Sequence, residues 1–174
     1  MTLAGYRAEL LSVPRDPRAA GAEAVEHYAD GLLVVEDGLI VAAGDFAKVA
    51  PSFPGLAITA FPGKMITPGF VDAHVHYPQT DRIASHGLQL LDWLEQHIFP
   101  AEAAFANAAH AAGTAAFFLD ELLRNGTTSA LVFPTVHSAS VNAIFQAAEA
   151  RGMRIISGKV LMDLGPENLR DDPA

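Results

Sequence analysis

Two histidines, His74 and His76, stand one residue apart in the stretch PGFVDAHVHYPQTD at residues 68–81. Imidazole nitrogens are frequent ligands of Zn²⁺, and two of them at this spacing could hold one cation. The spacing alone is a weak signal, because 7 histidines in 174 residues would give roughly 0.3 such pairs by chance. The elements around the pair therefore decide between a metal site and two structural histidines near the edge of a sheet.

The pair lies at the end of a predicted strand, residues 70–76, which follows a Pro-Gly turn. Alternate side chains of a strand share one face, so His74 and His76 should point together, with Asp72 deeper on the same face. Parallel α/β folds place their chemistry at the carboxyl ends of strands. We therefore predict that the two histidines are metal ligands and that Asp72 is either a structural carboxylate, the favoured role, or one that supports the ligands from behind.

Composition excludes several other classes of protein. The chain has no cysteine, so a metal would have to be held by His, Asp or Glu rather than by thiolates. The net charge is −9 and no run rich in Lys or Arg is present, which argues against a nucleic-acid or anionic membrane surface. The N-terminal stretch has no signal-peptide pattern, and no apolar run is long enough to span a bilayer. We expect a soluble, cytoplasmic protein.

Residues 1–67 have the pattern of short strands separated by turns. Strands are predicted at 3–13, 32–35, 39–42 and 58–61. Asp37-Gly38 between two apolar runs is a strong hairpin signal. Pro62-Gly63 predicts a further turn. We expect no amphipathic helix in this part.

From Pro68 onward, predicted strands alternate with helices. The strands are expected at 70–76, 128–133 and 154–162, and the helices at 88–98, 100–124 and 140–151. Apolar interior strands separated by helices indicate a parallel sheet with right-handed crossovers. In the long helix, spacings of three and four predict one buried stripe with a weak point at Gly113-Thr114. The predicted stripe consists of Phe105, Ala108, Ala112, Ala116, Leu119 and Leu123.

Three strands of this kind do not complete a barrel, which takes about 250 residues. An open three-stranded parallel sheet would also leave its edges and one apolar face exposed. The residues thus leave two readings open. The chain is either an unusually small α/β domain or part of something longer.

The segment PGFVDAHVH resembles the first barrel strand of the amidohydrolase superfamily, which carries a H-x-H metal motif there. Three further segments are similar to the guanine deaminase family within that superfamily. They read HYPQTDRIASHGLQLLDWLEQHIFPAE, FFLDELLRNGTTSALVFPTVH and EDGLIVAAGD. The resemblance covers nearly the whole chain and is most specific over residues 68–102.

This resemblance implies an α/β fold in which 68–174 form the first three strands of a (β/α)₈ TIM-like barrel. Residues 1–67 would be the N-terminal part of a small β-sandwich domain. It also implies one zinc ion per complete site and hydrolytic deamination of guanine to xanthine and ammonia, a step of purine catabolism. The complete enzyme would be a homodimer.

The resemblance assigns His74 and His76 as the zinc ligands. It assigns His76, Tyr77, Pro78 and Gln79 to the purine pocket. The other metal ligands and the proton-transfer groups of the family come from later strands, so no catalytic residue is expected within these 174 residues. We expect this chain alone not to deaminate guanine.

Two alternatives remain. One is another amidohydrolase, a deaminase or chlorohydrolase of a different purine, a pterin or a triazine. The other is a non-catalytic, metal-binding truncated remnant. Among the remaining candidates, His137 could line the pocket or be a solvated loop histidine, and Lys159 is expected inside the third strand. No partner at ligand spacing exists for His27, His86, His97 or His110.

Overall fold

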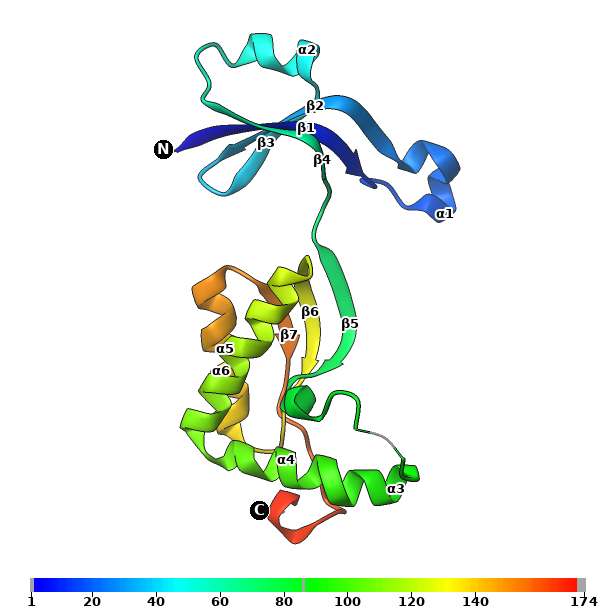
Figure 1. Cartoon of the computed structure of the whole chain (residues 1–174), viewed down its shortest axis with the longest axis vertical. Coiled ribbons are helices and arrows are strands. Elements are labelled where there is room, and N and C mark those ends of the chain that lie inside the picture. Colours follow the sequence, from blue (N-terminus) through cyan, green and yellow to red (C-terminus); the bar gives the residue numbers. More distant parts are fainter. Residues whose placement is uncertain (1, 86, 172–174) are drawn as a thin grey trace. The chain divides into compact units, whose positions relative to one another are not determined.

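The computed structural model describes residues 2–85 and 87–171, so His86 lies outside the described residues. The chain divides into two units, Met1–Pro68 and Gly69–Ala174, and each is described by itself (Figure 1). Within the described residues, no helix combines the length and the apolar character that crossing a membrane requires.

The first unit contains a four-stranded sheet in the order β3-β2-β1-β4. Its strands are β1 (Leu3–Ser12), β2 (Glu26–Glu36), β3 (Leu39–Asp45) and β4 (Ile58–Ile66). β2 pairs antiparallel with both β1 and β3, and β4 runs parallel to β1. Asp37 and Gly38 join β2 to β3 with φ of 48° and 85°, the positive values that a two-residue hairpin turn needs. The predicted hairpin is confirmed.

The predicted turn at Pro62-Gly63 is wrong, because β4 continues through it to Ile66. The register with β1 shifts there: Arg7 pairs with Ala60, but Glu9 pairs with Met65. The intervening residues form a bulge, which an edge strand tolerates even when it contains proline. The structure also contains two single-turn helices that were not predicted, α1 (Pro17–Ala20) and α2 (Phe46–Val49). Neither is long enough to show an amphipathic period.

The second unit contains a parallel sheet in the order β5-β6-β7. Its strands are β5 (Phe70–His76), β6 (Thr127–Phe133) and β7 (Arg154–Ser157). The long helices α5 (Ala108–Arg124) and α6 (Ser138–Arg151) lie side by side along one face of this sheet (Figure 1). The predicted mixed α/β class and the parallel pairing are confirmed.

The helical region before α5 is broken into short pieces. They are α3 (Leu90–Trp93), the π-turn η4 (Leu94–Ile98), α4 (Phe99–Ala103) and the 3₁₀ turn η5 (Ala104–Ala106). α5 begins afresh because the Asn107 side chain accepts hydrogen bonds from the backbone N–H groups of Ala109 and His110, at 2.9 and 3.1 Å. This arrangement is an N-cap. The predicted continuous helix from 100 to 124 is therefore wrong, and α5 continues through Gly113-Thr114.

The new start also changes the buried face of α5. The predicted stripe took its phase from Phe105, which lies before α5 in the 3₁₀ turn η5, so that phase does not carry over into α5. As a result, Ala108, Ala112 and Leu123 are exposed, contrary to prediction. The residues of α5 buried in the core are Ala111, Ala115, Phe118 and Leu119. They pack with Ala130 and Val132 of β6 and Ile144 of α6.

β7 is shorter than the predicted strand 154–162. Its neighbour β6 ends at Phe133 and is followed by Pro134, so the chain after Ser157 has no strand to pair with. The Val160 N–H instead donates to the Thr135 carbonyl at 3.3 Å. Lys159 thus lies beyond the strand, where its amine is paired with the Asp171 carboxylate.

Candidate metal and substrate site

The His74 and His76 side chains meet at the carboxyl end of β5. Their Nε2 atoms are 3.1 Å apart, so the predicted shared face is confirmed. Two ligands of a tetrahedral zinc with bonds of about 2.0–2.1 Å would be about 3.3 Å apart. The donor set and the spacing fit two positions of one zinc site. Their role as ligands stays a prediction.

Each imidazole is held by a neighbour. The ring of Phe133, at the end of β6, lies 4.7 Å from the His74 ring and 4.8 Å from the His76 ring, centroid to centroid. The Asp72 carboxylate accepts a hydrogen bond from the His74 backbone N–H at 3.0 Å. Sequence reasoning missed Phe133. Phe133 pairs with His76 in the parallel register of β5 and β6, and this register is set by partners distant in sequence.

The surroundings of His76 favour a neutral imidazole. Burial lowers the pKa of His76, and repulsion from His74 lowers it further. A neutral imidazole has the free lone pair that metal binding requires. Within residues 2–85 and 87–171, no group of three or more His, Asp or Glu side chains is arranged to hold a metal ion.

A cavity of about 620 Å³ adjoins the histidines. Its walls come from β5, from the 3₁₀ turn η3 (Tyr77–Arg82) and from α5. The walls are largely apolar, with Phe117 and Leu122 among them, and Gln79 supplies a polar group. The volume lies within the 300–1,000 Å³ range of small-molecule sites, so the cavity could take a flat heterocycle.

The four residues predicted for the purine pocket lie in two different environments in the structure. His76 and Gln79 line the cavity, whereas Tyr77 and Pro78 are buried in the core. The Tyr77 ring is 0% exposed and packs edge-on against Phe105 with centroids 5.1 Å apart. Tyr77 is therefore placed to anchor the segment rather than to touch a ligand with its side chain.

The Tyr77 hydroxyl donates a hydrogen bond to the Ser140 carbonyl at 2.6 Å, inside the core. Replacing Tyr77 with phenylalanine would remove this buried hydrogen bond, whose net contribution to stability is about 0.5–1.5 kcal/mol. We expect Tyr77→Phe to lower the free energy of unfolding by this amount in chemical denaturation. Tyr6→Phe, in the first unit, is the control. An unchanged midpoint for Tyr77→Phe would show that the bond contributes nothing.

His137 precedes the first residue of α6. Its Nε2 is buried and has no hydrogen-bond partner among the described residues, whereas the residue as a whole is half-buried, so both interpretations of His137 stay predictions. The loop around it is held by Thr135 and Ser140, whose hydroxyl oxygens lie 2.9 Å apart. The His137 backbone takes part in the same network, because its N–H donates to the Thr135 hydroxyl at 3.1 Å and its carbonyl accepts from the Ser140 hydroxyl at 2.8 Å.

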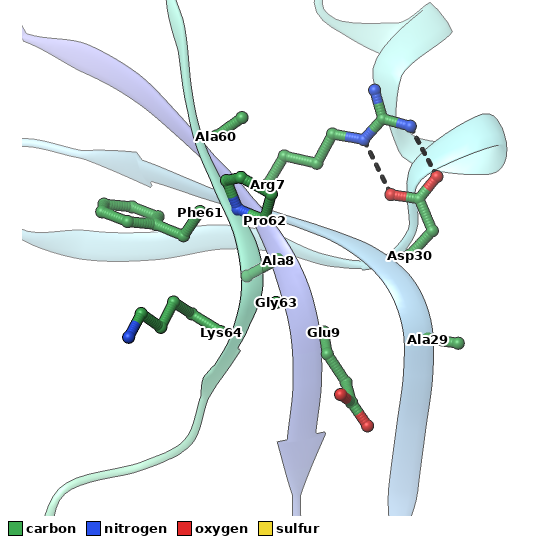
Figure 2. A pocket seen from close by; sticks show the side chains of 10 residues that line it. All are labelled: Arg7, Ala8, Glu9, Ala29, Asp30, Ala60, Phe61, Pro62, Gly63 and Lys64. Carbon is green, nitrogen blue, oxygen red and sulfur yellow. Dashed lines mark hydrogen bonds and ion pairs between the residues drawn. The ribbon is translucent and has the colours of Figure 1, made fainter.

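The first unit has its own cavity of about 440 Å³, shown in Figure 2. The Arg7 guanidinium donates to both Asp30 carboxylate oxygens at 2.7 and 2.6 Å and lies 3.7 Å from the centre of the Phe46 ring. The guanidinium holds the pKa of Asp30 below its usual value. The Lys64 amine points away from this pair (Figure 2). The charges on Arg7 and Asp30 are thus matched within the unit, which indicates a structural ion pair.

The histidine pair at the end of the first parallel strand is the feature to compare with known proteins. Residues 65–173, more than half of the chain, match the sequence model of a protein family that is described as "Amidohydrolase family". The chain belongs to the amidohydrolase family. The predicted superfamily is therefore confirmed, and deaminases of the amidohydrolase family typically depend on a metal.

Among individual members of the amidohydrolase family, several proteins similar to this chain are guanine deaminases. Guanine deaminase of Escherichia coli K12 is 42% identical over 174 residues, covering 98% of this chain and 40% of that protein. The crystal structure of guanine deaminase from Bradyrhizobium japonicum is 34% identical with a TM-score of 0.93, covering 99% of this chain and 38% of that one. A guanine deaminase of C. acetobutylicum, solved with guanine in its active site, is 28% identical with a TM-score of 0.85 over 98% and 39%. The chain thus spans about two fifths of the length of these relatives.

Proposed function

We propose that this chain is the N-terminal portion of a zinc-dependent enzyme that hydrolyses guanine to xanthine and ammonia. The single observation that carries the proposal is the placement of His74 and His76 beside a cavity that also presents Gln79. The likeness to guanine deaminases along nearly the whole chain supports this substrate rather than another amidohydrolase substrate.

The residues of this chain would have separate roles in binding the metal and in binding the purine. His74 and His76 would hold the metal through Nε2. Zinc, when bound there, makes hydroxide available from water at neutral pH. Gln79 would bind an edge of the purine, because its carboxamide offers an acceptor and a donor side by side. The apolar walls of the cavity would exclude bulk water from the bound base.

We propose that the further metal ligands and the groups that move protons belong to the part of the enzyme that this chain does not span. In this proposal the second unit is the first three strands of a (β/α)₈ barrel. The first unit is the N-terminal part of a β-sandwich. The complete enzyme would be a cytoplasmic homodimer, which light scattering of the full-length protein would test.

A substrate panel tests the proposed reaction. We expect the full-length, zinc-loaded protein to release one ammonia and form one xanthine per guanine consumed. Its kcat/KM for guanine should exceed that for other aminopurines, pterins and chlorotriazines by at least roughly 100-fold, because a site built to hydrogen-bond its substrate rejects poor matches strongly. Weak activity on guanine with strong activity on a triazine would favour the chlorohydrolase alternative instead.

The intact mass of the native polypeptide tests the proposed place of this chain in a longer enzyme. A mass well above 18.4 kDa is expected if the remaining ligands lie elsewhere in the same chain. A mass of 18.4 kDa would contradict that arrangement and favour the metal-binding remnant.

A further inference from the structure

β5 is not a regular strand where it carries the histidine pair. At one point in its parallel register with β6, two residues of β5 face a single residue of β6, since Ala73 and His74 lie opposite Leu131. The register pairs on either side are Asp72 with Ala130 and Val75 with Val132. Two residues against one is the arrangement of a β-bulge. His74 is therefore one of the two bulged residues.

The bulge is held by the residue that precedes it. A bulge interrupts the ladder of backbone hydrogen bonds between two strands, and neither Ala73 nor His74 has a partner in the register. The Asp72 carboxylate supplies one, because its Oδ1 accepts a hydrogen bond from the His74 N–H at 3.0 Å. Aspartate side chains readily make this contact with the backbone two residues further along the chain. The contact fixes the backbone at the point from which the His74 side chain extends.

The direction of the His74 side chain matters for the metal site. Alternate residues of a regular strand lie about 6–7 Å apart, whereas the Nε2 atoms of His74 and His76 converge to 3.1 Å. Bulges re-aim side chains and are frequent next to active sites. Phe133 packs against both imidazole rings, and the Asp72 contact acts on the backbone behind one of them. The two supports are therefore of different kinds.

We propose that Asp72 is a positioning residue of the metal site, which holds the bulge and so aims His74 at the cation that it shares with His76. The role of Asp72 comes from the place of its acceptor oxygen and not from its negative charge. This inference rests on the proposed function, since it assigns the histidine pair to zinc. It gives Asp72 a definite role, which the spacing of the residues left open between a structural carboxylate and support of the ligands.

The zinc affinity of the full-length enzyme, measured by competition with a chromogenic chelator, tests this role. Asp72→Ala removes the acceptor and should raise the Kd for zinc about 10- to 100-fold, the usual effect of losing a residue that supports a metal ligand. Asp72→Asn keeps an acceptor oxygen in the same place, so its Kd should stay within about 3-fold of the wild-type value. Asp72→Glu keeps the charge but displaces the carboxylate by one methylene, so its Kd should rise about 10-fold.

Two further measurements separate positioning from general support of the fold. The visible absorption of Co²⁺ bound in place of zinc reports the geometry of its ligands, and it should change in Asp72→Ala and Asp72→Glu but not in Asp72→Asn. Circular dichroism of the metal-free proteins shows which variants are folded. If Asp72→Ala is not folded, the contrast between Asp72→Asn and Asp72→Glu carries the test.

Asp45→Ala is the matched control for these variants. The Asp45 carboxylate, in the first unit, also accepts a hydrogen bond from the backbone two residues further along, the Ala47 N–H at 3.1 Å. Its replacement removes the same kind of contact and should leave the Kd for zinc and the Co²⁺ spectrum unchanged.

A rise in the zinc Kd of Asp72→Asn as large as that of Asp72→Glu would overturn the inference, because the place of the acceptor oxygen would then not be what matters. So would wild-type zinc affinity in Asp72→Ala or Asp72→Glu. These results leave the proposed function intact, provided that the wild-type enzyme binds zinc and deaminates guanine. A wild-type enzyme that binds zinc but does not turn over guanine would contradict the proposed function and leave the inference on Asp72 to the zinc measurements. A wild-type enzyme that binds no zinc would contradict both.

Discussion

Replacing His74 or His76 with alanine is expected to lower kcat/KM for guanine by at least roughly 1,000-fold in the full-length enzyme. The two Nε2 atoms, 3.1 Å apart, are the pair of donors that we propose for the metal. Without one of them the site loses the means of supplying hydroxide at neutral pH. Zinc content per polypeptide, measured by elemental mass spectrometry alongside turnover, should fall in the same variants.

His27→Ala is the matched control for the histidine variants. His27 is exposed in the first unit, and its Nε2 lies 2.7 Å from the Glu9 carboxylate, a surface contact worth at most about 1 kcal/mol. We expect it to retain zinc and activity. Full zinc content and turnover in His74→Ala would show that this imidazole is structural.

Replacing Leu119 with alanine is expected to lower the free energy of unfolding by about 2–5 kcal/mol. Leu119 is 0% exposed and belongs to the core cluster between α5, the sheet and α6. Its truncation removes apolar contacts and leaves a cavity that its neighbours fill only in part. Chemical denaturation of the wild type and the variant gives the difference directly.

Leu123→Ala is the control, because it makes the same change four residues later on the same helix. Leu123 is 39% exposed, so its truncation should cost less than about 1 kcal/mol. The periodicity read through an unbroken helix treats the two leucines alike. Equal losses of stability at both positions would therefore support the predicted stripe, and they would contradict the buried face that the structure gives α5.

The strand that carries the site could be predicted to its ends. Residues 70–76 alternate, follow a Pro-Gly turn and end in two histidines, and β5 has those bounds. The ends of α5 and α6 were readable from their stop signals, Asn125 with Gly126 and Gly152. Glycine at these points adopts the left-handed backbone that ends a helix.

Features set by partners distant in sequence could not be predicted. Nothing local shows that β7 stops at Ser157, because its length depends on where β6 ends. The bulge in β4 likewise depends on its register with β1. The break at Asn107 did have a local signal, since asparagine is a strong N-cap. It was masked by the alanine-rich stretch on both sides, which favours helix throughout.

The candidate site also combines residues that the sequence indicates with residues that only the folded structure brings close. Types and spacing indicated His74 and His76, the family resemblance added Gln79, and the structure brings all three to one cavity. The support of the two imidazoles comes from another element, since Phe133 lies on β6. The burial of Tyr77 was also hidden, because a tyrosine beside a polar motif reads equally well as a ligand contact and as a core residue.

A crystal structure of the full-length protein with guanine, recorded at the zinc absorption edge, tests the central claim most directly. We expect a zinc peak bonded to Nε2 of both His74 and His76, with a purine edge hydrogen-bonded to the Gln79 carboxamide. A zinc peak away from these histidines, or guanine bound without contact to Gln79, would contradict it.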